Sequence, residues 1–297
     1  MPTTLLLVDA YSLIYRAFYA IRNLTGPGGE PVNAVYGFTK MLRKLLADHQ
    51  PTHAAIAFDL GAPRQRLAVL PTYKAQRPPT PPALDVQLPV IREVLSAMRL
   101  PVIELEGEEA DDIIATLATR AAEQQAKVLI ASSDKDLLQL VGPLIQVIRP
   151  DGGETACVDP RAVETRYGVK PAQIVDLLSL TGDAVDNIPG VPGVGEKTAA
   201  ELLRTYSTLD NLLAHISEIT KPKLRDALAS RAEQLRLNRA LITLITDVTL
   251  PVRPEALTLQ PPDNGRLRSL FQQLGFKSLA AGLEKQTQDS QDLFAHR

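Results

Sequence analysis

Acidic residues in this sequence gather where they could hold a divalent cation. Glu109, Asp111 and Asp112 stand almost side by side, directly before an apolar run with helical spacing. Carboxylates held this close repel one another and raise each other's pKa unless a metal ion or basic groups neutralise them. The alternative is ordinary helix-start chemistry, because Asp and Glu also cap free N–H groups and face the positive end of the helix dipole. Taken alone, the cluster favours capping.

Acids recur after other strand-like runs, which favours a shared site. Asp9 closes the run 4–9, Asp59 closes the run 53–59, and Asp134 and Asp136 follow the run 127–131. Helix-like segments separate these runs, so the strands should be parallel and their carboxyl ends should share one edge of a sheet. We therefore expect one acidic pocket formed by Asp9, Asp59, Glu109, Asp111, Asp112, Asp134 and Asp136.

One of these acids has a second explanation. Asp136 stands three residues after Ser133, the spacing of a capping box. That explanation does not account for Asp134, so the metal-site interpretation is kept for both.

A basic segment accompanies the acids. Residues 60–84 contain no acid but carry Arg64, Arg66, Lys74 and Arg77, with Tyr73 beside Lys74. The prolines that close the segment exclude a continuous helix there. A solvated surface loop explains any single one of these bases. The clustering without counter-charge instead favours contact with phosphate groups.

The second half of the chain reads as mainly helical, with a domain boundary near residues 160–170. Asp183 and Asp186 stand three apart and could face the same way on one helical turn, although an isolated pair of this kind is more often a solvated turn.

Residues 188–199 have the pattern of a helix-hairpin-helix. Gly190, Gly193 and Gly195 would let the backbone approach a phosphate, and the helix that follows would direct its amino terminus and Lys197 at it. Glu196 separates Gly195 from Lys197, which excludes a nucleotide-binding Walker motif. A glycine-rich turn between two packed helices is the plain alternative.

The composition is that of a globular protein without a zinc site. The chain has 297 residues, 45% hydrophobic and 22% charged, which predicts a sizeable core and two domains. The net charge of −2 permits both an acidic site and a basic track. The single cysteine and the scattered histidines leave oxygen as the metal ligand, as for Mg²⁺ or Mn²⁺. No run is long enough for a membrane span or a signal peptide, which predicts a cytoplasmic protein.

Together these residues resemble a known family. From about Leu5 to about Glu284 the chain is similar to the 5′ nuclease domain of bacterial DNA polymerase I, in the flap endonuclease superfamily; the motifs that carry the resemblance lie at 7–9, 15–16, 29–38, 58–59, 73–75, 109–112, 133–140 and 181–190. The resemblance implies an α/β fold: a PIN-like core with a mainly parallel central sheet and a helical arch, then a mainly helical helix-hairpin-helix domain of the H3TH, SAM-like type. The expected parts are a catalytic domain at 1–165 with its arch at about 60–84, a DNA-binding domain at 166–284, and a polar tail at 285–297.

The resemblance also assigns roles to residues. It implies a structure-specific nuclease that cuts 5′ ends and 5′ flaps of duplex DNA with two or more Mg²⁺ or Mn²⁺ ions. Lys74 and Arg77 on the arch would touch the scissile phosphate, and Arg16 would help to position it. The hairpin from Gly190 to Lys197 would grip the duplex, with K⁺ bound among its carbonyls in relatives. The implied metal ligands are Asp9, Asp59, Glu109, Asp111, Asp112, Asp134, Asp136, Asp183 and Asp186.

The implied setting is bacterial DNA replication and repair. We expect a monomer in the cytoplasm, associated with the nucleoid, that acts on DNA or on RNA primers paired with DNA. A polymerase in the same or a separate chain is the implied partner, and no membrane is involved.

Some positions depart from the family pattern. Ala10 replaces a common glycine, and Gln65 and Ala68 replace the usual Phe and Glu ahead of the arch lysine. These changes bear on arch ordering and on the grip on the 5′ strand, since every acid of the site is present. Two other functions fit parts of the pattern: a PIN-type ribonuclease, and a branched-DNA-binding module without catalysis.

Overall fold

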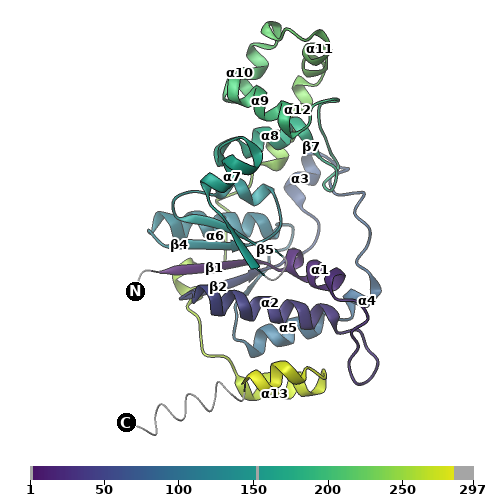
Figure 1. Cartoon of the computed structure of the whole chain (residues 1–297), viewed down its shortest axis with the longest axis vertical. Helices are drawn as coiled ribbons and strands as arrows, with labels where there is room; N and C mark the ends of the chain where they lie inside the picture. The colour runs from purple at the N-terminus through teal and green to yellow at the C-terminus, as the bar shows by residue number, and fades with distance from the viewer. Residues whose placement is uncertain (1–2, 152–153, 284–297) are drawn as a thin grey trace.

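The computed structural model describes residues 3–151 and 154–283. Figure 1 shows a sheet in the middle of an elongated molecule, helices above it and a last helix below it. Within the described ranges, no helix is both long and apolar enough to cross a membrane. The polar tail expected at 285–297 lies outside the described residues.

A six-stranded sheet holds the first domain together. Its order is β3 (Val102–Ile103), β2 (His53–Ala57), β1 (Thr4–Asp9), β4 (Lys127–Ala131), β5 (Ile145–Asp151) and β6 (Glu154–Val158). The first five strands are parallel and β6 runs antiparallel to β5. The strands expected from the runs 4–9, 53–59 and 127–131 are therefore present as β1, β2 and β4.

Helices cover both faces of this sheet, as expected where crossovers join parallel strands. The side chains of β1 alternate: Leu6 and Val8 pack among α1 (Ala10–Ala20), α2 (Asn33–His49) and α5 (Leu88–Ala97). Leu5 and Leu7 face the opposite way, against α6 (Ala110–Glu123). Burial on both faces fixes the strand ends in space, and with them the acids that follow.

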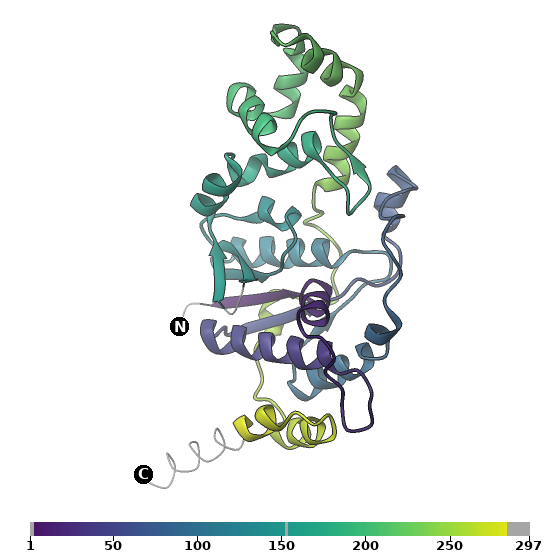
Figure 2. The ribbon, with the colours of Figure 1, turned by 45° about the vertical axis from the view of Figure 1, so that its right-hand side comes forward.

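The basic segment at residues 60–84 contains two short helices, joined by turns and an extended stretch. It consists of α3 (Arg64–Val69), turns over residues 71–76, an extended stretch and α4 (Pro82–Asp85). Figure 2 shows it running along one side of the molecule, from the helical domain to the level of α2 and α5. The proline-rich stretch forms no helix before Pro82, in agreement with the sequence prediction.

The second domain is a stack of short helices on α6. It contains α7 (Pro160–Tyr167), α8 (Ile174–Thr181), α9 (Glu196–Tyr206), α10 (Leu209–Ala214), α11 (Pro222–Ser230) and α12 (Ala232–Ile242). Between them lie the strands β7 (Gly182–Asp183) and β8 (Ile188–Pro189), and the 3₁₀ helices η2 (Pro171–Gln173) and η3 (Ile216–Glu218). Its apolar core is continuous with that under α6 and under the 3₁₀ helix η1 (Asp136–Leu140).

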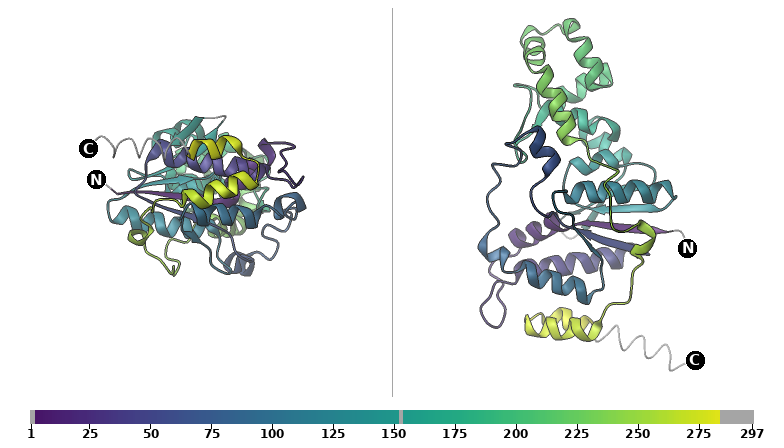
Figure 3. Two further views of the ribbon diagram at one scale, coloured as in Figure 1. Left: turned by 90° about the horizontal axis from the view of Figure 1, so that it is seen from below. Right: turned by 180° about the vertical axis from the view of Figure 1, so that it is seen from behind.

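The end of the chain returns to the first domain, which corrects the expected second domain of 166–284. After the 3₁₀ helix η4 (Pro254–Leu257), α13 (Asn264–Gln273) packs beside α5, and Leu267 and Phe271 are buried in the core of α2 and α5. Figure 3 shows α13 on the opposite side of the sheet from the helical domain. The apolar periodicity of this segment predicted a helix but carried no information on its partner.

Two glycines make the turn between α8 and α9 possible. Gly182 has a φ of +75°, and a Cβ there would meet the Gly190 nitrogen at 2.3 Å. A Cβ on Gly190 would meet the Thr181 carbonyl oxygen at 2.1 Å. The two backbones therefore touch where β7 and β8 pair, and only glycine fits.

We expect Gly190→Ala to lower the free energy of unfolding by about 1–3 kcal/mol, because backbone atoms cannot move aside to admit the methyl group. Gly195→Ala is the matched control, since a Cβ there meets nothing within 4 Å and Gly195 has no positive φ. Denaturant unfolding of both variants checks this. Equal stability of the two variants would contradict the close contact.

Candidate active site

Three neighbouring parallel strands deliver acids to one edge of the sheet. Asp9 ends β1 and accepts hydrogen bonds from the Ser12 backbone N–H (3.1 Å) and the Ser132 hydroxyl (2.7 Å). Asp59 follows β2 and accepts the Ala110 N–H at 2.7 Å, while Asp134 follows β4. Together with Asp111 these carboxylates line one cavity of ≈ 780 Å³.

The buried acids are poorly compensated. Burial, together with the charges of Asp59 and Asp134, raises the pKa of Asp9 to about 6, although hydrogen bonds from Ser132 and Ser12 act to lower it. Burial and the neighbouring Asp134 raise the pKa of Asp111 and of Asp136 well above the ordinary value. Burial also raises the pKa of Asp134. The site therefore favours any positive charge that can reach it.

The donor set fits an oxygen-liganded divalent cation. Oδ1 of Asp111 and Oδ1 of Asp136 are buried and have no hydrogen-bond partner among the residues that the structure describes. Carboxylate oxygens are the ligands that Mg²⁺ and Mn²⁺ prefer. In residues 3–151 and 154–283, no three His, Cys, Asp or Glu side chains are arranged to hold a metal ion as they stand.

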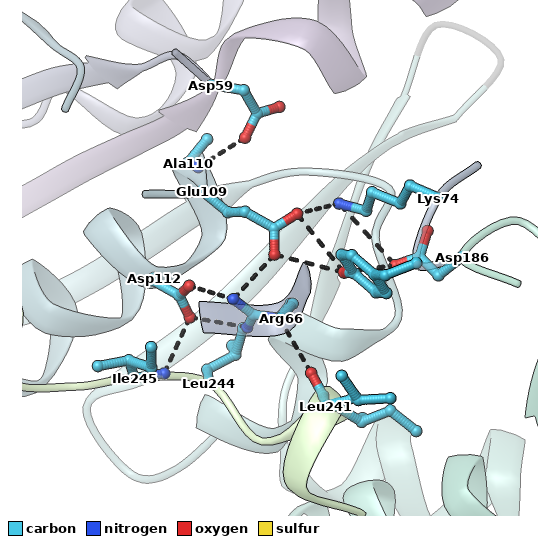
Figure 4. A network of polar contacts seen from close by, with 12 residues as sticks. Asp59, Arg66, Lys74, Glu109, Ala110, Asp112, Asp186, Leu241, Leu244 and Ile245 are labelled. Carbon is cyan, nitrogen blue, oxygen red and sulfur yellow. Dashed lines mark hydrogen bonds and ion pairs between the residues drawn. The ribbon is translucent and has the colours of Figure 1, made fainter. Parts of the chain in front are cut away.

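Basic side chains of the arch neutralise the remaining acids. Figure 4 shows Lys74 on the carboxylate of Glu109 and near Asp186. Arg77 donates to Asp186 Oδ1 at 2.6 Å. Burial lowers the pKa of Lys74, but the charges of Glu109 and Asp186 more than offset this and raise it. Lys74 and Arg77 also line the cavity, together with the acids of the strand ends.

Asp112 has a different partner from the other acids. Its side chain is fully buried, and its two oxygens accept hydrogen bonds from the two terminal nitrogens of Arg66. Oδ1 also accepts the Ile245 N–H at 2.9 Å. With both oxygens engaged by protein groups, Asp112 fastens α6 to Arg66 and Ile245 in this structure, and its role as a metal ligand stays a prediction.

Two residues expected to contact DNA are buried instead. Arg66 is 7% exposed and pairs with Asp112 and Glu109. Tyr73 is 5% exposed, and its hydroxyl donates to Asp186 Oδ2 at 3.0 Å. Acids from distant segments enclose both side chains in this structure, and a contact of either with DNA stays a prediction.

The other expected cations differ in place. Arg64 is exposed at the start of α3, so it remains accessible to a ligand. Arg16 is partly buried on α1 and does not belong to the cavity lining among the described residues.

Asp183 and Asp186 do not share a helical turn, which corrects that expectation. Asp183 lies in β7 and pairs with Lys135 at 3.3 Å, while Asp186 lies in the following turn and faces the arch. The charges of both acids raise the pKa of Asp136, so they lie at the border of the acidic pocket.

The three glycines of the hairpin differ in their surroundings. Gly190 is required by its close approach to the Thr181 carbonyl, and a phosphate contact of Gly190 stays a prediction. Gly193 has a φ of +81° and Gly195 caps the amino terminus of α9, with open space around both. Lys197 is exposed in the first turn of α9, so this helix start remains accessible to an anion.

A row of tyrosines forms the wall of the cavity that sequence reasoning did not assign. Tyr11, Tyr15 and Tyr19 on α1 line it, with ring centroids 6.1 Å and 6.3 Å apart along the row. The Tyr15 hydroxyl lies 3.3 Å from the Thr80 hydroxyl across the cavity. Their spacing of four residues was visible in the sequence, but such a stripe usually indicates core packing.

Two family descriptions match nearly the whole described chain. "5'-3' exonuclease, N-terminal resolvase-like domain" matches residues 4–168, and "5'-3' exonuclease, C-terminal SAM fold" matches residues 169–265. Among solved structures, T5 5'-exonuclease with bound zinc superimposes with a TM-score of 0.69 at 24% identity, covering 82% of this chain and 90% of that one. The catalytic core of Rad2 with DNA superimposes at 0.60 and 19% identity, covering 95% and 93%. These likenesses confirm the expected fold.

Curated relatives are similar over most of this chain. A DNA polymerase I of Bacillus caldotenax is 43% identical over 98% of this chain and 33% of its own length, so the chain spans about a third of that relative. A 5'-3' exonuclease of Aquifex aeolicus is 39% identical over 95% of this chain and 96% of its own length. The resemblance inferred from the sequence is therefore confirmed, and the chain belongs to the 5′-3′ exonuclease family.

Proposed function

We propose that this chain is a structure-specific 5′ nuclease that hydrolyses phosphodiesters at 5′ ends and 5′ flaps of duplex DNA in replication and repair. The observation that carries the proposal is the cavity itself. Asp9, Asp59, Asp111 and Asp134 line it together with Lys74 and Arg77. Acids that attract divalent cations thus share one cavity with bases that attract a phosphate, and the family membership supports the same activity.

The acids and the bases of the cavity would have different roles in the proposed reaction. Asp9, Asp59, Asp111, Asp134 and Asp136 would hold divalent cations, Mg²⁺ or Mn²⁺, with Glu109, Asp183 and Asp186 beside them. When bound, such ions supply a nucleophilic hydroxide and neutralise charge on the phosphate. Lys74 and Arg77 would offset the negative charge that develops on the phosphate oxygens, which acts on turnover more than on affinity.

The proposed substrate grip lies on the second domain. The start of α9 with Gly193, Gly195 and Lys197 would bind the duplex backbone, with K⁺ among the hairpin carbonyls. Rad2 with DNA and the DNA polymerase I relatives support a DNA substrate and work alongside a polymerase. We propose that the nuclease acts as a monomer.

Cation binding should relieve the charge on Asp9. The pKa of Asp9 rises from 3.8 to about 6 on folding, so the folded chain holds this proton more tightly. In EDTA, the free energy of unfolding of wild type relative to that of Asp9→Asn should therefore be highest below pH 3.8. It should fall by at most about 3 kcal/mol as the pH rises through about 6. Mg²⁺ at neutral pH should stabilise wild type and fail to stabilise Asp9→Asn.

Thermal unfolding across pH, with EDTA or Mg²⁺, measures both effects. Glu201→Gln, an exposed acid on α9, controls for the loss of one negative charge. A difference between wild type and Asp9→Asn that rises over this pH range would contradict the assignment.

Cleavage of a 5′-flap duplex in Mg²⁺ tests the function directly. We expect Asp134→Ala to lose activity by at least about 10²-fold because a cation ligand is missing, while Glu201→Gln cuts like wild type. Rates on single-stranded RNA separate the nuclease from a PIN-type ribonuclease. Binding of flap DNA without turnover in Mg²⁺ would instead indicate a branched-DNA-binding module.

Lys74→Ala should lower kcat on the flap substrate by about 10²-fold and change KM little, since Lys74 would act on charge that forms in the transition state. Steady-state kinetics at saturating Mg²⁺ measures this, with exposed Lys277→Ala as the matched control. An increase of KM at unchanged kcat would mean that Lys74 only binds the ground state.

A further inference from the structure

Arg66 is a buried guanidinium at the point where three parts of the chain meet. It lies on α3, at the foot of the arch, and is 7% exposed. Its Nη1 lies 2.8 Å from Glu109 Oε2, and its Nη2 donates to Asp112 Oδ1 at 2.9 Å. Its Nε donates to the Leu241 carbonyl at 3.0 Å, in the last turn of α12 (Figure 4). One side chain thus joins the arch, the acidic helix α6 and the second domain.

The joint between α12 and α6 is fixed by further hydrogen bonds. Asp112, Thr116 and Arg120 lie one helical turn apart on one face of α6. They bond in turn to Ile245 N–H (2.9 Å), to Val248 N–H (3.2 Å) and to the Val248 carbonyl (2.8 Å). This row of bonds sets the register of the segment after α12 along the acidic helix.

Gln139 holds the same joint from the other side. Its Nε2 donates to the carbonyls of Asp136 (2.8 Å) and Ile242 (3.0 Å). Its Oε1 accepts the Leu244 N–H at 3.0 Å. The end of α12 is therefore tied to both acid-bearing segments, α6 and η1.

The helix α12 is also fixed to the hairpin. Asn238 in α12 is fully buried and donates to the carbonyls of Ser179 (3.0 Å) and Pro189 (2.7 Å), directly before Gly190. Figure 3 shows α3 beside α12 when the molecule is seen from behind. A continuous set of hydrogen bonds thus leads from the hairpin through α12 and Arg66 to Glu109.

We propose that Arg66 is a positioning residue that sets the spacing between the duplex held at the hairpin and the acids that cut, and so selects the phosphodiester that is cleaved. This rests on the proposed function, because it requires that the hairpin binds the duplex. The planar guanidinium reaches Asp112, Glu109 and Leu241 at once in fixed directions. A lysine keeps the charge but cannot form this fork.

Arg66→Lys tests the proposal through the position of the cut. Under single-turnover conditions on an end-labelled 5′-flap duplex, wild type should give one dominant product length. Arg66→Lys should spread the cut over neighbouring phosphodiesters and slow it about tenfold, with the half-saturating Mg²⁺ concentration little changed. Arg266→Lys, an exposed arginine on α13, is the matched control and should cut like wild type.

Gln139→Ala provides a second variant that leaves the buried charges intact, and it should spread the products in the same way. Thermal unfolding identifies which variants are folded, and if Arg66→Lys does not fold, Gln139→Ala decides. A folded variant that keeps the wild-type product length overturns the proposal, whatever its rate. If Arg66→Lys changes only the half-saturating Mg²⁺ concentration, then Arg66 acts only by holding Glu109 in place. That result also overturns the proposal. Failure of the proposed function itself is separate, because wild type would then leave the flap uncut in Mg²⁺.

Discussion

The structure depends on the balance of charge at the carboxyl edge of its sheet. Lys74, Arg77 and Lys135 pair with Glu109, Asp186 and Asp183. Within the described part of the chain, no such pair relieves Asp111 or Asp136, which keep buried oxygens without partners there and have pKa values raised by burial and by Asp134. Because interactions between charges strengthen as water is excluded, this repulsion must be opposed by the rest of the fold.

The apolar framework supplies that opposition. β1, β2 and β4 are buried on both faces, so the strand ends cannot move apart to relieve the acids without exposing core side chains. The helix α6 contributes twice: Ile113 and Ile114 are fully buried against the sheet, while Asp111 reaches the cavity and Asp112 reaches Arg66. A site that repels itself is thus held in place by side chains that take no part in its chemistry.

Local sequence patterns carried the fold of the first domain and the main acids, because an apolar run followed by an acid and a helix determines which sheet edge receives the side chain. The same patterns could not show that Arg66 and Tyr73 are buried. Their partners Glu109, Asp112 and Asp186 are distant in sequence. From local sequence alone, a basic segment without acids is therefore predicted to be exposed to solvent. The close approach of Gly190 to Thr181 was likewise not visible in the sequence, because it depends on how the chain folds. The return of α13 to α5 was hidden for the same reason.

The bases of the arch neutralise acids of the site in this structure and would contact the phosphate in the proposed reaction. Lys74 and Arg77 now neutralise Glu109 and Asp186, and Asn187 donates to the Thr72 carbonyl at 2.8 Å, which holds the arch against the second domain. The acids and bases of the site thus compensate each other in the protein alone. In the proposed function, a divalent cation at Glu109 or Asp186 would compete with these bases for the same oxygens. A base displaced in this way would be left beside the cavity with an unpaired positive charge, which is the charge that a phosphate requires.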